Sequence, residues 1–211
     1  MMLVKSFTFN PFQENTYVLS DDTKNCVIVD PGCYNNQEQN ELLEYIKRNN
    51  LTPQRLLNTH AHIDHVFGNR FVSDYFNLDL ELHDLDLPVL DAASYSAKQY
   101  GLDYTTSPLP KKSLKEGNQI KFGNTVLDIL HIPGHAPGHV VFYNKAAKII
   151  IGGDVLFRGS IGRTDLPGGN HQDLIKNIKS KLFTLEDDIV VYSGHGPSTT
   201  IGYERKTNPF F

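Results

Sequence analysis

Residues 60–65 of this 211-residue chain read His60-Ala61-His62-Ile63-Asp64-His65, so three histidines and a carboxylate fall within six positions. Imidazole and carboxylate groups are ligands that zinc prefers, and so dense a cluster rarely serves packing. At the end of a strand, His60 and His62 point to the same side. Asp64 and His65 then have to serve a second position, because one tetrahedral ion cannot easily take four ligands from one tight turn. The segment therefore predicts two metal ions side by side.

Three later motifs place further candidate ligands beside glycines. Residues 133–139 read PGHAPGH, a turn fixed by glycine and proline that presents His135. The motifs GGD at 152–154 and GHG at 194–196 each follow an apolar run, so Asp154 and His195 are expected at strand ends. Glycine beside a ligand lets the backbone take tight conformations and approach closely. The candidate metal ligands therefore come from both halves of the chain.

In this order, the HxHxDH, PGHxxGH, GD and GHG motifs resemble those of the metallo-β-lactamase superfamily over nearly the whole chain. The resemblance implies an α/β (α+β) fold of the metallo-β-lactamase type. This fold is a four-layer αβ/βα sandwich, with the metal ions at one edge between the two halves. We expect one domain over residues 1–211. Since only residues 196–211 follow His195, we expect no helical C-terminal domain that holds glutathione.

The resemblance also assigns the ligands to two metal ions. One ion takes His60, His62 and His135, the other takes Asp64, His65 and His195, and Asp154 bridges both. Zinc is the expected metal, and iron and manganese accept the same ligands. Two such ions about 3.5–4 Å apart can generate hydroxide at neutral pH and polarise a carbonyl. Asp64 is in addition expected to orient the nucleophile, as a catalytic residue.

Within the superfamily, the chain looks most like short, single-domain bacterial hydrolases of the glyoxalase II-like group. Residues 158–165 (RGSIGRTD) and 202–210 (GYERKTNPF) carry this resemblance. It implies hydroxide attack on a thioester of the S-acylglutathione class. Arg163 stands where that group has a glutathione-binding lysine, so we expect Arg163 to bind the anionic end of the substrate.

Two other functions stay open. A persulfide dioxygenase would use a single iron held by His60, His135 and Asp154, a two-histidine, one-carboxylate arrangement with open positions for oxygen. A non-catalytic binding protein on the same scaffold is the other alternative, although every candidate ligand is in place. Oxygen consumption with glutathione persulfide would favour the dioxygenase over the hydrolase.

Two residues are predicted to support the ligands rather than to bind metal. Asp30, in the Val-Asp-Pro-Gly segment 29–32, is either an ordinary turn residue or an anchor beneath the histidines, and both interpretations stay open. His139 lies four residues after His135 and begins a strand. Since the other seven candidates already complete two sites, we expect His139 to pack behind them or to hold a ligand in place.

Composition limits the partners. A formal net charge of −4 argues against nucleic acid, which usually calls for a basic face. No run approaches the roughly 20 apolar residues of a membrane span, and residues 1–7 lack a secretory signal. Two cysteines, Cys26 and Cys33, do not make a disulfide framework, so a reducing cytoplasm is the expected compartment. A small thioester or ester is the expected partner, and the sequence carries no signal for the oligomeric state.

The apolar patterns predict alternating strands and helices. Strands are expected over 4–9, 16–19, 26–29, 55–58, 120–122, 126–130, 140–143, 149–151 and 189–192. Helices are expected over 35–50, 66–76 and 170–183. The apolar stripe of 66–76, which includes Tyr75, is interpreted as core. Residues 84–116 are expected to form a helix followed by a lid-like loop.

Overall fold

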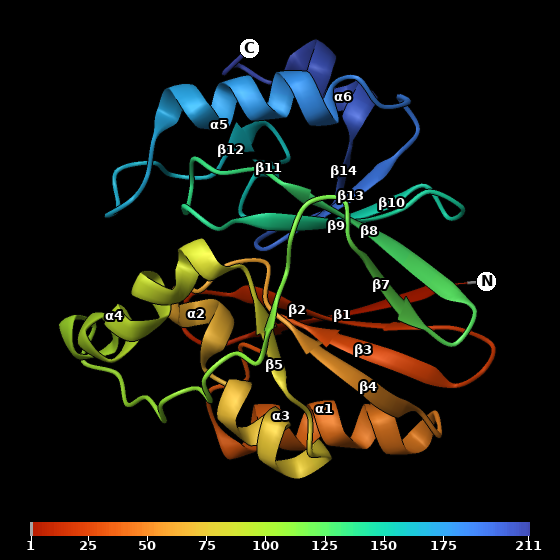
Figure 1. Cartoon of the computed structure of the whole chain (residues 1–211), viewed down its shortest axis with the longest axis vertical. Helices are drawn as coiled ribbons and strands as arrows, with labels where there is room; N and C mark the ends of the chain where they lie inside the picture. The colour runs from red at the N-terminus through yellow and green to blue at the C-terminus, as the bar shows by residue number, and fades with distance from the viewer. Residues whose placement is uncertain (1) are drawn as a thin grey trace.

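The computed structural model describes residues 2–211; Met1, the first residue of the expected domain, lies outside the described residues. Two six-stranded sheets pack face to face, and helices cover the outer face of each sheet (Figure 1). This arrangement confirms the predicted four-layer αβ/βα sandwich. No helix within residues 2–211 has the length and apolar character needed to cross a membrane.

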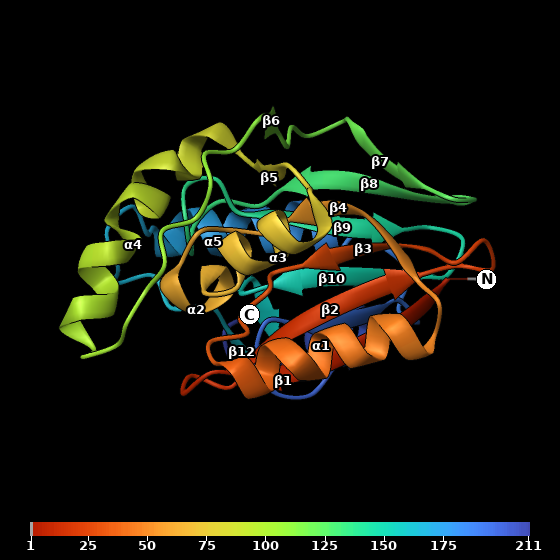
Figure 2. The same cartoon turned by 90° about the horizontal axis from the view of Figure 1, so that it is seen from below.

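The first sheet has the strand order β1-β2-β3-β4-β5-β6. Its strands are β1 (Leu3–Phe9), β2 (Glu14–Ser20), β3 (Asn25–Val29), β4 (Thr52–Leu57), β5 (Leu80–Leu82) and β6 (Lys112–Ser113). Strands β1 to β3 pair antiparallel, and β3 to β6 pair parallel. The helices of this half are α1 (Asn36–Arg48), α2 (Ile63–Val66), α3 (Asn69–Phe76) and α4 (Leu87–Gln99), the last preceded by a 3-10 turn (Asp84–Asp86). Figure 2 shows α1 and α3 lying across the outer face of the sheet, with α4 beyond one end.

The second sheet has the order β14-β13-β10-β9-β8-β7. Its strands are β7 (Gln119–Phe122), β8 (Thr125–His131), β9 (Val140–Asn144), β10 (Ile149–Gly153), β13 (Val190–Ser193) and β14 (Thr199–Thr200). Only β10 and β13 pair parallel. Helices α5 (His171–Asn177), continued by a π-helical turn (Ile178–Leu182), and α6 (Ile201–Thr207) cover its outer face, and β11 (Leu156–Phe157) with β12 (Ser160–Ile161) forms a separate hairpin.

Three buried clusters fill the three spaces between the four layers. The middle cluster joins Val27 and Val29 of β3 with Phe142 of β9 and Ile151 of β10. The outer two lie beneath α1, α3 and α4 on one side and beneath α5 and α6 on the other. Because the central strands are covered on both faces, β2 is buried along its whole length instead of alternating. This packing holds the strand ends, and the loops that follow them, in fixed positions.

Four details differ from the sequence expectations. The helix predicted over 66–76 is split into α2 and α3, because the Gly68 amide bonds to the Pro31 carbonyl oxygen at 2.7 Å. Tyr75 is 51% exposed, so its place in the predicted core stripe was wrong. Helix α5 ends six residues early, at Asn177, in the π-helical turn. Helix α6 and the short strands β5, β6, β11, β12 and β14 had no counterpart in the prediction. Cys26 and Cys33 are both buried and free.

Candidate metal centre

The candidate ligands all follow the ends of strands. The loop after β4 carries His60 and His62, and Asp64 and His65 lie on α2. His135 lies in the turn between β8 and β9. Asp154 follows β10, and His195 follows β13, the parallel neighbour of β10. The structure brings all seven residues together at one edge of the two sheets.

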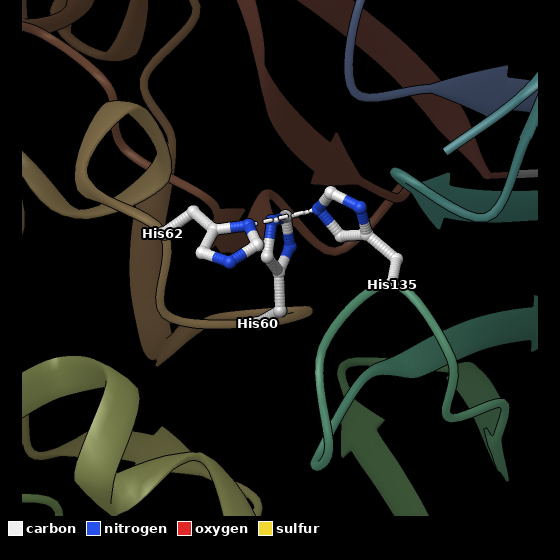
Figure 3. Close-up of side chains that lie close together, drawn as sticks. All are labelled: His60, His62 and His135. Carbon is white, nitrogen blue, oxygen red and sulfur yellow. Dashed lines mark hydrogen bonds between the residues drawn. The ribbon is translucent and has the colours of Figure 1, made fainter. Parts of the chain in front are cut away.

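Three imidazoles form what we call the first cluster: His60, His62 and His135. The Nδ1 atom of His62 lies 2.8 Å from Nε2 of His135, and that Nε2 lies 3.2 Å from Nε2 of His60 (Figure 3). Burial and the neighbouring His135 lower the pKa of His62 to about 3, and burial with the other imidazoles holds the pKa of His60 well below its usual value. The three rings are therefore neutral at pH 7, with lone pairs that converge on one point.

The second cluster consists of Asp64, His65 and His195. Nε2 of His195 lies 3.0 Å from Oδ2 of Asp64, and Nε2 of His65 lies 3.8 Å from the same oxygen. Burial opposes the charged imidazole of His65, but Asp154 and Asp64 outweigh burial and raise its pKa well above the usual value. For His195, burial is likewise outweighed by the hydrogen bond with Asp64, which raises the pKa. Without a metal ion, this cluster therefore holds protons.

Asp154 lies between the two clusters. Its Oδ2 is 3.6 Å from Nε2 of His135 in the first cluster and 3.5 Å from Nε2 of His195 in the second. Its Oδ1 is 3.4 Å from Nε2 of His65. The approach is close enough that a Cβ atom on Gly194 would stand 2.1 Å from Oδ1 of Asp154, so position 194 needs glycine. Burial would raise the pKa of Asp154, yet His65 and His135 lower it far below its usual range, so the side chain is a carboxylate.

Asp30 lies directly behind both clusters. Its Oδ2 accepts hydrogen bonds from Nδ1 of His65 at 3.1 Å and from the Thr59 hydroxyl at 2.6 Å. Since the Thr59 proton is used on Asp30, the Thr59 oxygen accepts from Nδ1 of His60, 3.0 Å away. Both histidines therefore keep a proton on Nδ1 and direct Nε2 at the site, the nitrogen that each can offer to a metal ion. One carboxylate thus orients one histidine of each cluster.

Backbone carbonyl groups orient two more histidines. Nδ1 of His135 donates to the Arg163 carbonyl oxygen at 2.7 Å, and Nδ1 of His195 donates to the Phe12 carbonyl oxygen at 3.1 Å. His139 is turned the other way, because its Nε2 accepts the backbone N–H of Asp154 at 3.0 Å. Its ring stacks on His60 with centroids 4.6 Å apart. His139 therefore fixes the backbone of Asp154 through Nε2, while its buried Nδ1 has no hydrogen-bond partner within residues 2–211.

The donor set fits divalent metal ions. Nε2 of His65 and Oδ1 of Asp154 are buried and have no hydrogen-bond partner within residues 2–211. Buried polar atoms are normally paired, so a nitrogen and a carboxylate oxygen that face each other at 3.4 Å fit a cation bound by both. The three-histidine group and the group of Asp64, His65 and His195 each place three ligand atoms within 4.8 Å of one another. Zinc, iron and manganese all accept nitrogen and carboxylate ligands of this kind.

A cavity of about 820 Å³ opens over the clusters. Its walls are mainly apolar and include Phe12, Phe157 and the face of α4 that carries Val89 and Ala92. Helix α4, the predicted helix of segment 84–116, therefore forms a wall of this site. Arg163 lines the cavity, and its guanidinium forms a two-point ion pair with Asp165, with N–O distances of 2.7 and 2.8 Å.

Sequence reasoning missed three buried groups that support the site. Thr59 connects Asp30 with His60, as described above. Glu14, fully buried, has Oε1 3.8 Å from Nδ1 of His65, and burial raises its pKa well above the usual value. Asp86 accepts the backbone N–H groups of Ala61 at 2.8 Å and Gly138 at 2.6 Å, which ties the histidine loop to the His135 turn. Only the position of Thr59, directly before the histidine cluster, could have suggested its role.

Comparisons with known proteins agree with this geometry. A family profile described as "Metallo-beta-lactamase superfamily" matches residues 9–195. The chain is 37% identical to a protein of Haemophilus influenzae named hydroxyacylglutathione hydrolase GloC, over 99% of this chain and 98% of that protein. Two crystal structures superpose on nearly the whole chain. One is TTHA1623 in a di-iron-bound form (TM-score 0.89, 40% identity, 99% and 100% covered). The other is described as BLEG-1 B3 metallo-beta-lactamase (TM-score 0.90, 38% identity, 99% of each chain covered).

Proposed function

The chain belongs to the metallo-β-lactamase superfamily of metallo-hydrolases, and we propose that it is a thioester hydrolase of the glyoxalase II-like, S-acylglutathione class that works with two metal ions. The observation that carries the proposal is the position of Asp154, within 3.4–3.6 Å of imidazole nitrogens from both clusters. A carboxylate in that position can bridge two cations. The similarity to a hydroxyacylglutathione hydrolase supports the choice of a thioester.

The residues would hold the metal ions as follows. His60, His62 and His135 would hold one ion, Asp64, His65 and His195 would hold the second, and Asp154 would contact both. Divalent cations held there supply a hydroxide nucleophile at neutral pH and Lewis-acid polarisation of the scissile carbonyl. We expect zinc, and iron has to be tested beside it because the similar protein TTHA1623 has a di-iron-bound form.

Thioester hydrolysis needs no change of oxidation state. The oxygen of the attacking water or hydroxide bonds to the carbonyl carbon, and the carbon–sulfur bond breaks. The sulfur leaves as a thiolate and takes up a proton, giving a carboxylic acid and a thiol. Four ligand histidines are held in place during this reaction by hydrogen bonds at Nδ1. The partners are Asp30, Thr59 and the carbonyl oxygens of Arg163 and Phe12.

Asp64 is the proposed catalytic residue of the chain itself. Burial would raise its pKa, but His65 and the hydrogen bond from His195 lower it below the usual value, so Asp64 is ionised at neutral pH. Its Oδ2, held by His195 at 3.0 Å, can accept a hydrogen bond from the attacking oxygen and hold it in line with the carbonyl carbon. Arg163 stays a proposed contact for an anionic end of the substrate, and there the substrate has to share Arg163 with Asp165 or displace Asp165.

The test is a substrate panel on metal-loaded protein. The panel contains an S-hydroxyacylglutathione thioester, the matching oxygen ester, a β-lactam, and glutathione persulfide in an oxygen electrode. We expect one thiol released per thioester consumed, with no oxygen uptake. Asp64→Asn, which keeps the size of the side chain, should lower kcat by at least about tenfold. His171→Asn, at an exposed position that does not line the cavity, is the matched control and should match the unsubstituted protein.

The same substrate panel distinguishes the hydrolase from the persulfide dioxygenase. A persulfide dioxygenase would need only His60, His135 and Asp154 and would consume oxygen with glutathione persulfide. The buried, unpaired Nε2 of His65 favours the two-metal hydrolase, because a single iron would leave the second cluster without a ligand role. Oxygen uptake without thioester cleavage, or cleavage of the β-lactam in strong preference to the thioester, would contradict the proposal.

A further inference from the structure

We propose that Arg158, held against Tyr203 of helix α6, is the main anion-binding residue of the cavity and selects thioesters whose thiol portion carries a carboxylate. The inference rests on the proposed thioesterase function and names a determinant of its substrate. Among the described residues that line the cavity, the only lysine or arginine side chains are Arg158 and Arg163. These two residues therefore supply the cationic side chains available to an anionic substrate group.

The two arginines differ in what already neutralises them. Arg163 is bound at two points by Asp165, at 2.7 and 2.8 Å, so a substrate carboxylate there competes with an existing carboxylate. Arg158 forms no ion pair with any residue of the described chain, 2–211. Its guanidinium carbon instead lies 5.3 Å from the centre of the Tyr203 ring. A guanidinium stacked on a ring keeps the N–H groups along its edge free, and that edge matches a carboxylate at two points.

The position of Arg158 is fixed by the backbone beneath it. Arg158 and Gly159 form the tip of the β11–β12 hairpin, in which Phe157 pairs with Ser160 and Gly159 has a φ of 70°. The hairpin begins two residues after Asp154, and the Phe157 ring lies 6.2 Å from the ring of His195. The tip therefore lies one residue beyond a side chain that already packs against the second cluster.

Helix α6 holds this hairpin in place through buried polar groups. Oε2 of Glu204, which is fully buried, accepts the Gly159 N–H at 2.9 Å. Nδ2 of Asn208 donates to the Ser160 carbonyl oxygen at 3.0 Å and to Glu204 at 2.7 Å. Tyr203 on the same helix then contacts the Arg158 side chain. Both the backbone and the side chain of Arg158 are thus positioned by one short helix, which is the preorganisation that a recognition residue needs.

The experiment measures binding separately from hydrolysis. The probe is S-hexylglutathione, a thioether that cannot be hydrolysed, titrated calorimetrically into metal-loaded protein. The variants are Arg158→Ala, Arg158→Lys, Arg163→Ala, Tyr203→Leu and Tyr203→Phe. Arg48→Ala is the control, since Arg48 lies on α1 in the opposite outer layer. Metal content is measured for each variant, because a change in the clusters would confound the result.

Loss of a charge-assisted hydrogen bond predicts a Kd about 10- to 100-fold higher for Arg158→Ala. Arg158→Lys should recover part of the affinity, and Arg163→Ala should raise the Kd by less than about threefold, because Asp165 already occupies Arg163. Tyr203→Leu should weaken binding by a few-fold and Tyr203→Phe should not, because phenylalanine keeps the ring face. With an acylglutathione and an N-acetylcysteamine thioester of the same acyl group, Arg158→Ala should raise KM for the charged substrate at least tenfold more than for the neutral one, with kcat little changed.

The outcomes separate this inference from the proposed function. Binding that depends on Arg158 without any thioester cleavage would keep the anion site and overturn the thioesterase. Thioester cleavage together with equal thioether affinity in Arg158→Ala and the unsubstituted protein would keep the thioesterase and overturn the role of Arg158. Failure of the unsubstituted protein to bind S-hexylglutathione, or equal losses for charged and neutral thioesters, would also overturn the role of Arg158.

Discussion

The first cluster holds three imidazoles and no carboxylate of its own, whereas the second combines two imidazoles with the carboxylate of Asp64. Burial keeps the imidazoles of the first cluster neutral, with the pKa of His62 near 3. In the second cluster, neighbouring carboxylates raise the pKa of His65 and of His195. The same residue type is therefore a bare ligand on one side of Asp154 and a proton carrier on the other.

This difference has a consequence for metal binding. An ion that enters the first cluster meets lone pairs that are already free. An ion that enters the second cluster has to displace protons from His65 and His195, so its affinity falls at lower pH. Asp154 joins the two sides, because its carboxylate contacts histidines of both. We therefore expect a lower pH to weaken metal binding by the second cluster more than by the first.

Substitution of the shared residue should have the largest effect. Asp154→Ala removes a ligand from both sides and leaves two cations without an anion between them. We expect loss of most bound metal and a fall in activity of more than about a hundredfold, beyond the 10- to 100-fold typical of residues that only support ligands. Inductively coupled plasma mass spectrometry and a thioester assay measure both. Asp154→Ala protein that keeps two ions and full activity would show that Asp154 is not a ligand shared by the two clusters.

Asp30→Ala should have the second-largest effect on metal binding. Asp30 orients His65 directly and His60 through Thr59, so both clusters lose one fixed histidine tautomer. We expect metal affinity to fall about 10- to 100-fold at both sites. Competition with a fluorescent chelator gives the two affinities. Asp128→Ala is the control, because this half-buried carboxylate of β8 pairs with Lys145 and not with a ligand. A weakening confined to the second cluster would show that the Thr59 connection to His60 is unimportant.

In the metal-free protein, the two clusters should change the free energy of unfolding in opposite directions as the pH changes. The folded pKa of His62 lies below its unfolded value of about 6.5, so its stabilising contribution is complete above pH 6.5 and is lost as the pH falls toward 3. The folded pKa of His195 is raised, so its contribution is present below pH 6.5 and is lost as the pH rises through the folded value.

Urea unfolding in chelator at several pH values measures this opposition. His62→Gln should flatten the fall in the free energy of unfolding below pH 6.5 by up to about 1.4 kcal/mol per pH unit, the value for one proton. His195→Gln should instead reduce the loss of stability above pH 6.5. Parallel profiles for the two variants would mean that the clusters do not differ in protonation.

Arg163→Ala should have the smallest effect, since Asp165 already neutralises the guanidinium. We expect less than about a threefold change in kcat/KM for an anionic thioester, the range of an exposed ion pair. Asp165→Asn provides the opposite control, because it frees Arg163 and should lower KM. A loss of 10-fold or more in Arg163→Ala would return the main anion contact to Arg163.

Much of the fold and the ligand set can be predicted because the information is local. Each candidate ligand stands in a short motif at the end of an apolar run, as His135 does in PGHAPGH, and a strand end is where such a residue can project into a site. The four layers follow from strands buried on both faces, such as β2. The resemblance between motif order and a known superfamily then assigned the ligands to two groups.

The supporting contacts could not be predicted, because they join segments far apart in the chain. The sequence around Asp30 fits both a turn residue and an anchor, and only the hydrogen bonds to its carboxylate from Thr59 and His65 distinguish the two. Asp86 showed no signal at all, since nothing in the residues around it indicates bonds to Ala61 and Gly138. The neutralisation of Arg163 by Asp165, two residues away, depends on side-chain conformation and not on spacing.

Activity measured against the number of bound metal ions decides whether the protein uses both clusters. Metal-free protein is titrated with Zn²⁺, and separately with Fe²⁺ under anaerobic conditions, while thioester hydrolysis and bound metal are followed in the same samples. We expect activity to rise to a plateau at two ions per chain in the unsubstituted protein, and to a lower plateau at one ion per chain in His195→Gln. A plateau at one ion per chain in the unsubstituted protein, unchanged by His195→Gln, would contradict this expectation.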